Sequence, residues 1–205
     1  GFGRECYAWV HQALGSQEGF VFRGFIDDNP HALNGFHYFP GVVSCIDDFD
    51  TDEDISLILA NGIPKQKKNI VERMAKYKDR WRNLIHPTAT LGENIKLGTG
   101  IVVAPHAVIS SDTSIGHFVG INFFSTVSHD ATVGDYSQLS SYCDLTGAAS
   151  IGQSVFLGSH ASVLPGVCVR DGATVGAGSV CVKSVEPATT VFGVPARPLP
   201  KEQKV

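Results

Sequence analysis

The sequence predicts a small α/β domain followed by a parallel β-helix built from six-residue repeats. Two observations predict this architecture: roughly the first 85 residues carry helix and strand signals without a common period, and a six-residue period then runs unbroken from residue 91 to residue 186. With 205 residues, the chain is long enough for both parts to bury a core. We expect the α/β domain at 1–85, the β-helix at 86–186 and a C-terminal tail at 187–205.

The composition is that of an ordinary globular protein and excludes several functions. A formal charge of −4, with 18% charged residues, argues against a nucleic-acid or anionic-membrane partner, which would need a basic face. The five cysteines follow neither a disulfide framework nor the CxxC spacing of a zinc site, which favours a reducing compartment. No apolar run is long enough to span a bilayer, and the N-terminus lacks the pattern of a signal peptide. We therefore expect a cytoplasmic protein without nucleic-acid or membrane partners.

The N-terminal part predicts a small parallel sheet of the doubly wound, Rossmann-like type. The opening GFGRECYAWVHQALG indicates a glycine-rich turn that leads into a helix ending near Gly15. GFVFRGF indicates a strand, which the turn residues 27–30 close. DISLILA indicates a second strand, followed by a turn at 61–62 and a helix with Pro64 near its start. Because a phosphate-binding glycine turn needs a strand before it, we also expect a first strand ahead of Gly1 that this sequence lacks.

Sixteen consecutive hexads make up the repeat, from LGENIK at 91–96 to CVKSVE at 181–186. The first position is Leu, Ile or Val in fifteen hexads and Cys181 in the last, and the fifth is always small or aliphatic. The second position is small in thirteen hexads, which suits a tight corner where a large side chain would clash. The pattern lacks the spacing of an amphipathic helix, so it predicts short strands joined by corners and stacked as a solenoid. First and fifth positions should point inward, and third and fourth positions outward.

These hexads resemble the hexapeptide repeats of acyltransferases, which form a left-handed parallel β-helix. The resemblance implies a triangular prism with three hexads, or about 18 residues, in each coil. Sixteen hexads would make a little over five coils and stand roughly 25 Å tall at the usual strand spacing. Some proteins of this fold hold zinc with three histidines, but the prism histidines here include no pair five or 36 residues apart. We therefore expect no metal site.

His129 and Asp130 occupy the third and fourth positions of their hexad, so both side chains should point away from the core. Ser111 lies one coil before His129, and Gly147 lies one coil after it. A glycine beside an outward histidine allows a ligand close to the backbone, and its N–H is a candidate oxyanion donor. The alternative is a histidine on an ordinary polar turn.

Aromatic side chains form two further columns of fourth positions, with neighbours one coil apart. One column comprises His106, Phe124, Tyr142 and His160, and the other comprises Phe118 and Tyr136. Stacking between successive turns would explain both columns, and so would a subunit interface or a wall of the acceptor site. The resemblance implies trimers with active sites between neighbouring prisms, which favours the second explanation.

The whole chain resembles the two-domain nucleotide-sugar acetyltransferases of bacterial glycan assembly, including that of lipopolysaccharide O-antigens. The most specific segments are FIDD at 25–28, SHDATVGD at 128–135 and FGVPARP at 192–198, and GFGRE at 1–5 matches the second half of the family's glycine-rich opening. The resemblance implies a homotrimer that uses acetyl-CoA and no metal. N-acetylating members act on nucleotide-linked 4-amino-4,6-dideoxy sugars, and a similar branch O-acetylates sialic acid.

The resemblance also implies a role for each site residue. His129 would act as the general base, Asp130 would orient it, and Gly147 would donate its N–H to the thioester oxygen. The implied acceptor residues are Gly1 and Gly3 near the phosphates, Asp27 and Asp28 at the base and ribose, and Asn122 near the sugar. The implied coenzyme A residues are Gly147, Ser159, Ala177, Lys183, Gly193, Pro195 and Arg197.

Three hypotheses for function remain. The first is N-acetylation of a nucleotide-linked amino sugar, the second is O-acetylation of sialic acid or another sugar hydroxyl, and the third is a non-catalytic scaffold. A scaffold would not require His129, Gly147 and the segment 193–197 to occur together. The two carboxylates of FIDD favour a nucleotide-linked acceptor, and the inward position of Cys143 argues against a covalent intermediate.

Overall fold

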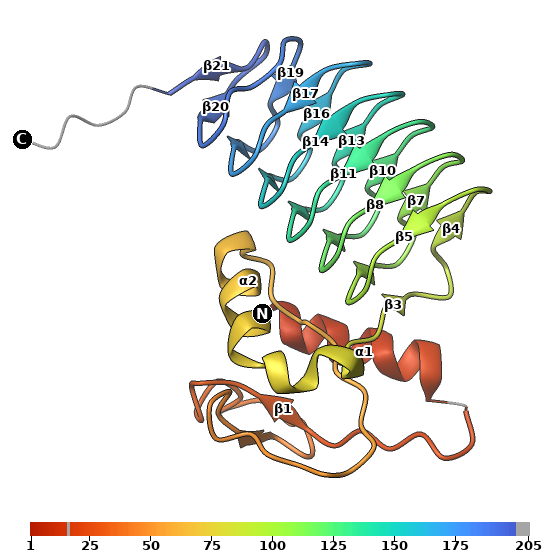
Figure 1. Cartoon of the computed structure of the whole chain (residues 1–205), viewed down its shortest axis with the longest axis vertical. Coiled ribbons are helices and arrows are strands. Elements are labelled where there is room, and N and C mark those ends of the chain that lie inside the picture. The colour runs from red at the N-terminus through yellow and green to blue at the C-terminus, as the bar shows by residue number, and fades with distance from the viewer. Residues whose placement is uncertain (16, 200–205) are drawn as a thin grey trace, which may run out of the picture.

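The computed structural model describes residues 1–15 and 17–199, and it consists of two parts (Figure 1). The N-terminal part contains helix α1 (Phe2–Leu14), strands β1 (Phe25–Ile26) and β2 (Val42–Ser44), helix α2 (Pro64–Arg73) and the 3-10 helix η1 (Ala75–Arg80). The second part is a stack of coils that begins beside α1 and carries the short strands β3 to β21. No helix within the described ranges is long and apolar enough to cross a membrane.

The stack is a parallel β-solenoid with three faces, as the six-residue period predicts. Its strands are β3 (Leu84–Ile85), β4 (Thr90–Leu91), β5 (Lys96–Leu97), β6 (Val102–Val103), β7 (Val108–Ile109), β8 (Ser114–Ile115), β9 (Gly120–Ile121), β10 (Thr126–Val127), β11 (Thr132–Val133), β12 (Gln138–Leu139), β13 (Asp144–Leu145), β14 (Ser150–Ile151), β15 (Phe156–Leu157), β16 (Ser162–Val163), β17 (Cys168–Val169), β18 (Thr174–Val175), β19 (Val180–Cys181), β20 (Thr190–Phe192) and β21 (Arg197–Pro198). They form an eight-stranded, a six-stranded and a five-stranded sheet. Pairing joins residues one coil apart, as Val127 with Leu145, so three hexads make each coil. The stack begins at β3, one hexad before Leu91, because Ile85 continues the period upstream.

First and fifth hexad positions fill the interior of the solenoid, as predicted. Val127 and Leu145, at first positions, are fully buried, and so are Ala131 and Ala149 at fifth positions. The alternation of a branched and a small side chain lets successive coils interdigitate at close-packed density. This buried column is the main core of the protein, and it leaves the third and fourth positions at the surface.

The corners turn at the fourth hexad position, which corrects the prediction that the small second positions form them. Eleven non-glycine residues at fourth positions, from Asn94 to His160, adopt φ between 53° and 61°. The second position is small for a different reason, namely its contact with the backbone of the next coil. A Cβ on Gly134 would lie 2.4 Å from the carbonyl carbon of Gly152, and one on Gly98 would lie 2.7 Å from that of Gly116. The second position is small because the backbones of successive coils nearly touch there.

Each of the three corners carries a different set of side chains, and we name each corner for its set. The His129 corner joins the six- and five-stranded sheets at 93–94, 111–112, 129–130, 147–148, 165–166 and 183–184. The aromatic corner joins the eight- and six-stranded sheets at 105–106, 123–124, 141–142, 159–160 and 177–178. The docking corner joins the five- and eight-stranded sheets at 99–100, 117–118, 135–136, 153–154 and 171–172.

The N-terminal sheet is parallel as predicted but differs in its strands. Helix α1 ends where expected, with the Gly15 N–H donating to the His11 carbonyl at 2.9 Å. Strand β1 pairs with β2, a strand that the sequence did not predict. The strand expected within 54–60 does not form, and Leu57 makes only an isolated bridge to Trp81. Leu57 and Leu59 are both buried by side-chain packing, so their apolar alternation reflects packing without a neighbouring strand.

The N-terminal part packs against the first coils at two places. Cys6 and Trp9 of α1 form one apolar cluster with Val102 of the eight-stranded sheet. Trp81, just after η1, meets the ring of Phe118 at the docking corner edge to face, with 5.5 Å between ring centroids. Phe118 is buried as a result, so the column that it forms with Tyr136 is covered by the N-terminal part.

Replacing Gly134 by alanine should destabilise the solenoid by about 1–3 kcal/mol, because the added methyl group would press on the backbone of the next coil. Gly166 is the matched control, since its Cβ would meet nothing within 4 Å and Asn94 shows that the fourth position accepts asparagine. Gly166→Asn should change the free energy of unfolding by less than about 1 kcal/mol. Urea denaturation of both variants measures the two changes. Equal losses would contradict the role of coil spacing.

Candidate active site

His129 and Asp130 form a hydrogen-bonded pair at the surface of the His129 corner. The pair follows β10, and the chain turns at Asp130, whose φ is 58°. The Nδ1 of His129 lies 2.8 Å from Oδ2 of Asp130, and the two side chains are 68% and 62% exposed. A carboxylate accepts only, so Nδ1 carries the proton in this bond and Nε2 of a neutral ring is left to accept. The arrangement suits a base that takes a proton at Nε2 from an outside donor.

Gly147 lies directly against the imidazole of His129, as the one-coil spacing predicts. A Cβ at Gly147 would lie 2.7 Å from both Cε1 and Nε2 of the ring. Any side chain there would therefore displace the imidazole, so glycine allows the ring to occupy this position. Within the described part of the chain, no hydrogen bond uses the Gly147 N–H, while the N–H of Ala148 next to it donates to the His129 carbonyl. An unused N–H beside Nε2 can stabilise a negatively charged oxygen.

Asn122, Ser159 and Ala177 lie at or next to the aromatic corner, away from His129. Asn122 directly follows β9, and its Oδ1 accepts the N–H of Phe123 at 2.9 Å. His129 stands at the other end of the face that carries β10. A single chain therefore does not bring Asn122 or the aromatic-corner residues to the imidazole.

The aromatic corner carries a continuous stack of rings. His106, Phe124, Tyr142 and His160 stack with centroid separations of 5.1, 5.1 and 4.8 Å and interplanar angles of 20°, 10° and 2°. Stacking between turns is thus present, and Phe124 and Tyr142 remain about half exposed. Ser159 lies immediately before His160, so one end of this apolar surface adjoins two of the implied coenzyme A residues.

The remaining implied coenzyme A residues lie toward the C-terminal end of the solenoid. Lys183 is exposed on the His129 corner, three coils beyond His129. Gly193 lies in the turn between β20 and β21 and is held by the Ser179 hydroxyl, which accepts its N–H at 2.9 Å. Pro195 and Arg197 follow in the same exposed hairpin. These groups are close to one end of the stack but do not converge on His129.

In the N-terminal part, Asp28 is already fully engaged. Arg73 donates to both of its carboxylate oxygens, at 2.6 and 3.1 Å, and the Ile46 N–H donates to Oδ1 at 3.1 Å. The hydrogen bonds from Arg73 hold the pKa of Asp28 below its usual value, and the pKa of Asp47 is lowered by the same guanidinium. Asp27 accepts the Asn29 N–H at 2.9 Å through Oδ1 alone. Among the described residues, Oδ2 of Asp27 receives no hydrogen bond, so it is the carboxylate oxygen available to a ligand.

Gly1 and Gly3 stand at the start of α1. Gly1 precedes the first turn, and its carbonyl accepts the Arg4 N–H at 3.0 Å. Gly3 is inside the helix, where a Cβ would lie 4.0 Å from the Ala60 side chain. Gly1 therefore fits an anion site at the helix N-terminus, while at Gly3 a Cβ would make only an ordinary van der Waals contact.

Sequence reasoning missed a row of ion pairs between two segments of the N-terminal part. Asp47, Asp50 and Asp54 pair with Arg73, Lys76 and Arg80, and each pair is 26 residues apart. The signal was the acidic run DDFDTDED together with basic residues three and four apart near the end of α2 and in η1. The equal separations indicate that the two segments run side by side in the same direction.

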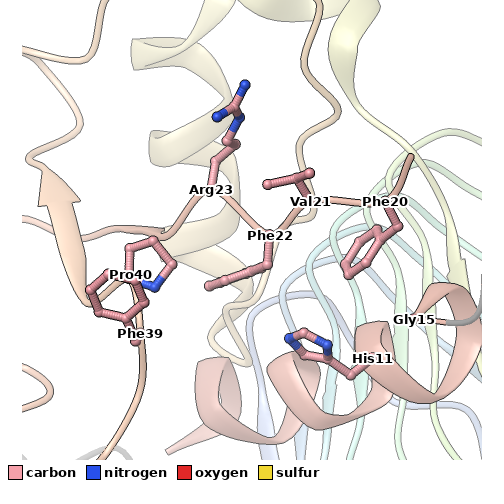
Figure 2. Close-up of a pocket in the computed structure, with 8 residues that line it drawn as sticks. All are labelled: His11, Gly15, Phe20, Val21, Phe22, Arg23, Phe39 and Pro40. Carbon is pink, nitrogen blue, oxygen red and sulfur yellow. The ribbon is translucent and has the colours of Figure 1, made fainter. Parts of the chain in front are cut away.

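The described residues contain no group of three or more His, Cys, Asp or Glu that would hold a metal ion. His86 is buried between the two parts, with Nε2 2.6 Å from Gln12 and Nδ1 2.8 Å from Thr88, and burial lowers its pKa. An open hollow of about 580 Å³ lies between α1 and the segments 20–23 and 39–40 (Figure 2). Half of its lining residues have aromatic rings, none is an implied site residue, and Arg23 at its rim pairs with Glu53.

Comparisons with known proteins agree with this architecture. Residues 148–181 match a family described as the hexapeptide repeat of succinyl-transferase. The structure resembles PerB from Caulobacter crescentus in complex with CoA and GDP-perosamine, with a TM-score of 0.82, 27% identity and coverage of 98% of this chain and 93% of that chain. It also resembles the acetyltransferase domain of PglB from Neisseria gonorrhoeae, with a TM-score of 0.83, 29% identity and 97% coverage of both chains.

Curated relatives match over a shorter segment. The galactoside O-acetyltransferase of Escherichia coli is 42% identical over 43 residues, or 21% of each chain. The matched segments span about a fifth of the length of such relatives. The repeat is therefore of the hexapeptide type, and the structures that the chain resembles over nearly its whole length are acetyltransferases. The chain shares its two-part fold with the perosamine N-acetyltransferase of Caulobacter crescentus and the PglB acetyltransferase domain.

Arg73→Gln should lower the free energy of unfolding at neutral pH. It should also make this free energy less dependent on pH in the acid range. The carboxylates of Asp28 and Asp47 have lowered pKa values in the folded chain, so their pairing stabilises it above the ordinary carboxyl pKa of about 4. That stability is lost as the pH falls through the lowered values.

The difference in the free energy of unfolding between wild type and Arg73→Gln should therefore be largest near pH 7 and shrink below about pH 4. Urea titrations at several pH values measure it. Arg170→Gln is the control, because Arg170 lies 3.9 Å from its carboxylate partner Glu186. If the difference in the free energy of unfolding between wild type and Arg73→Gln stays constant down to pH 2, the ion pairs of Arg73 do not stabilise the fold.

Proposed function

We propose that the chain transfers the acetyl group of acetyl-CoA to the amino group of a nucleotide-linked 4-amino-4,6-dideoxy sugar. The observation that carries this proposal is the exposed imidazole of His129, oriented by Asp130 and lying against Gly147. The full-length similarity to a perosamine N-acetyltransferase bound to CoA and GDP-perosamine supports an amino sugar as acceptor. Two of the similar structures are variants of that enzyme in which one histidine is replaced by asparagine or alanine.

In this reaction His129 acts as general base. The acceptor nitrogen attacks the thioester carbonyl carbon, and Nε2 takes the proton that the nitrogen loses. The Gly147 N–H donates to the carbonyl oxygen as it becomes negative, and Asp130 stabilises the imidazolium that forms. The C–S bond then breaks, the amide remains, and the thiolate of CoA leaves with a proton from the imidazolium. No covalent intermediate with the protein is needed, since Cys143 is buried in the core.

The acyl donor would bind along the aromatic corner and the C-terminal hairpin. Ser159 and Ala177 offer small side chains and main-chain groups there, Arg197 of the hairpin offers charge for phosphates, and Lys183 offers charge from the His129 corner. The similar PglB domain is known in complex with acetyl coenzyme A, which supports the same donor here.

The proposal includes a homotrimer with active sites between neighbouring subunits. His129 and the aromatic-corner residues lie at opposite ends of one face, so one chain holds them apart. A neighbouring solenoid that presents its aromatic corner to the His129 corner would complete the site. The half-exposed stack at Phe124 and Tyr142 provides an apolar surface for that contact. All five cysteines are free thiols, which is consistent with placing the enzyme in the cytoplasm.

O-acetylation of a sugar hydroxyl is the second candidate. The same base can deprotonate a hydroxyl, and the match to a galactoside O-acetyltransferase over 43 residues favours it. Thiol release from acetyl-CoA with a panel of acceptors separates the two. The panel holds UDP-, dTDP- and GDP-linked 4-amino-4,6-dideoxy sugars, sialic acid, CMP-sialic acid and a galactoside. Release with one amino sugar supports N-acetylation, and release only with a hydroxyl acceptor overturns it.

His129→Ala should lower turnover by roughly 10²–10⁴-fold while leaving the affinity for acetyl-CoA nearly unchanged, because a base acts on the acceptor's proton. His117→Ala is the matched control, since His117 is also an exposed third-position histidine but lies at the docking corner. Steady-state thiol release and calorimetric CoA binding measure the two effects. Retained turnover in His129→Ala would remove this residue from the mechanism.

Two inactive variants should complement each other if the site forms between subunits. His129→Ala removes the base at one corner, and Ala177→Trp blocks the aromatic corner. Unfolding and refolding the two together should restore about a quarter of wild-type activity, because a random mixture pairs two intact corners at about one site in four. Refolding each alone gives the baseline. Absence of any gain in the mixture would place the whole site within one chain.

A further inference from the structure

Lys67 of α2 is buried in the contact between the N-terminal part and the solenoid. It is 2% exposed, and its Nζ donates to the main-chain carbonyls of Phe118 and Ser137 at 3.1 and 3.0 Å. These two carbonyls belong to successive coils at the docking corner. Among the described residues, the Phe118 carbonyl has no other hydrogen-bond donor. Lys67 therefore connects α2 with two coils of the solenoid at once.

The amine of Lys67 has no acidic partner in the described part of the chain. Burial lowers its pKa to about 7, and Cys6 of α1 is the titratable group that acts on it. Burial also raises the pKa of the Cys6 thiol, so Cys6 stays neutral. On the solenoid side, Asp135 and Tyr136 are the ionisable neighbours of Ser137, and burial raises the pKa of Tyr136.

An apolar side chain of the same length would fill this space without the cost of burying an amine. What the amine adds is two directed hydrogen bonds, which fix the position of α2 along and around the solenoid. The same helix carries Arg73, which holds Asp28 through two hydrogen bonds. Six residues separate Lys67 and Arg73, or about 9 Å along a helix. One rigid element thus joins the solenoid to the loop that contains Asp27 and Asp28.

We propose that Lys67 is a positioning residue, which sets α2 and the acceptor-binding loop at a fixed place relative to the solenoid. Its hydrogen bonds are to main-chain carbonyls of the solenoid and its side chain is buried, so its role is to hold α2 in place. The kinetic part of this inference rests on the proposed function, because it assumes that the N-terminal part binds the acceptor. The structural part does not, since the contact between α2 and the docking corner exists in any case.

Lys67→Met tests the proposal, because methionine has a similar length and no donor. The value of kcat/KM for the acceptor should fall about 10–100-fold, while the KM for acetyl-CoA stays within about twofold. Lys68→Met is the control, since Lys68 is the next residue on α2 and is exposed. Where Lys67→Met yields no folded protein, Lys67→Gln replaces it with a shorter side chain that keeps one donor. Unchanged kinetics, or an equal loss for both substrates, would overturn the proposal.

Two readouts do not depend on the reaction. Hydrogen exchange of the α2 amides should be faster in Lys67→Met than in Lys68→Met, with exchange in the last coils unchanged. The stability of the wild type relative to Lys67→Met should also rise between pH 6 and pH 8.5. A lysine with a pKa of about 7 in the fold and 10.5 unfolded makes the folded state bind fewer protons in that range.

These readouts separate the two proposals. If no acceptor releases thiol from the wild type, the proposed function fails, and exchange and pH dependence still decide the role of Lys67. If the wild type is active and neither the exchange of α2 nor the pH dependence differs between the two variants, the positioning role is wrong while the proposed function stands.

Discussion

The spacing between successive coils is the constraint on which the rest of the structure depends. Parallel strands lie about 4.8 Å apart, and the corner backbones come so close that second positions such as Gly98 and Gly134 have no room for a Cβ. The same spacing stacks the rings of the aromatic corner at 4.8–5.1 Å. It also sets the imidazole of His129 directly against Gly147. The candidate catalytic pair is therefore a consequence of the repeat, in which one glycine leaves open the space that the ring occupies.

The repeat made much of the solenoid predictable, because every hexad meets the same environment in the next coil. Counting one coil from His129 identified Gly147, and the hexad position alone indicated that His129 and Asp130 face outward. The sequence predicts the turn at the second position, because the residues there are small. A small residue shows that space is restricted, but it does not show which neighbour restricts it. Positive φ is what defines the corner, and tyrosine, histidine and aspartate adopt it at fourth positions without any sequence signal.

The N-terminal part was less predictable because its contacts are not periodic. The apolar alternation around Leu57 resembled a strand, but its partner is Trp81 and its neighbours are side chains. The helix PKQKKNIVER contains three lysines, and its sequence does not distinguish Lys67 from Lys65 or Lys68. Only the carbonyls 51 and 70 residues further on make Lys67 the buried one. The ion pairs of Arg73 were equally hard to predict, because the sequence shows acidic and basic residues in distant segments but not which of them pair.

Distance decides how these pieces can act together. The aromatic corner and the His129 corner are separated by one solenoid face of about six residues, or roughly 20 Å of extended chain. Acyl transfer needs reacting atoms about 3–3.5 Å apart, so a thioester held at the aromatic corner would be too far from the base of the same chain. In the proposed trimer a neighbouring subunit would remove this separation, and the site would then depend on how accurately each N-terminal part is placed on its own solenoid. Helix α2 makes that placement through a buried amine at one end and an exposed guanidinium at the other. Exposed ion pairs such as those of Arg73 contribute little free energy, so their effect is to align α2 with the loop that contains Asp28. The buried contact of Lys67 is the one that resists displacement of α2 from the solenoid.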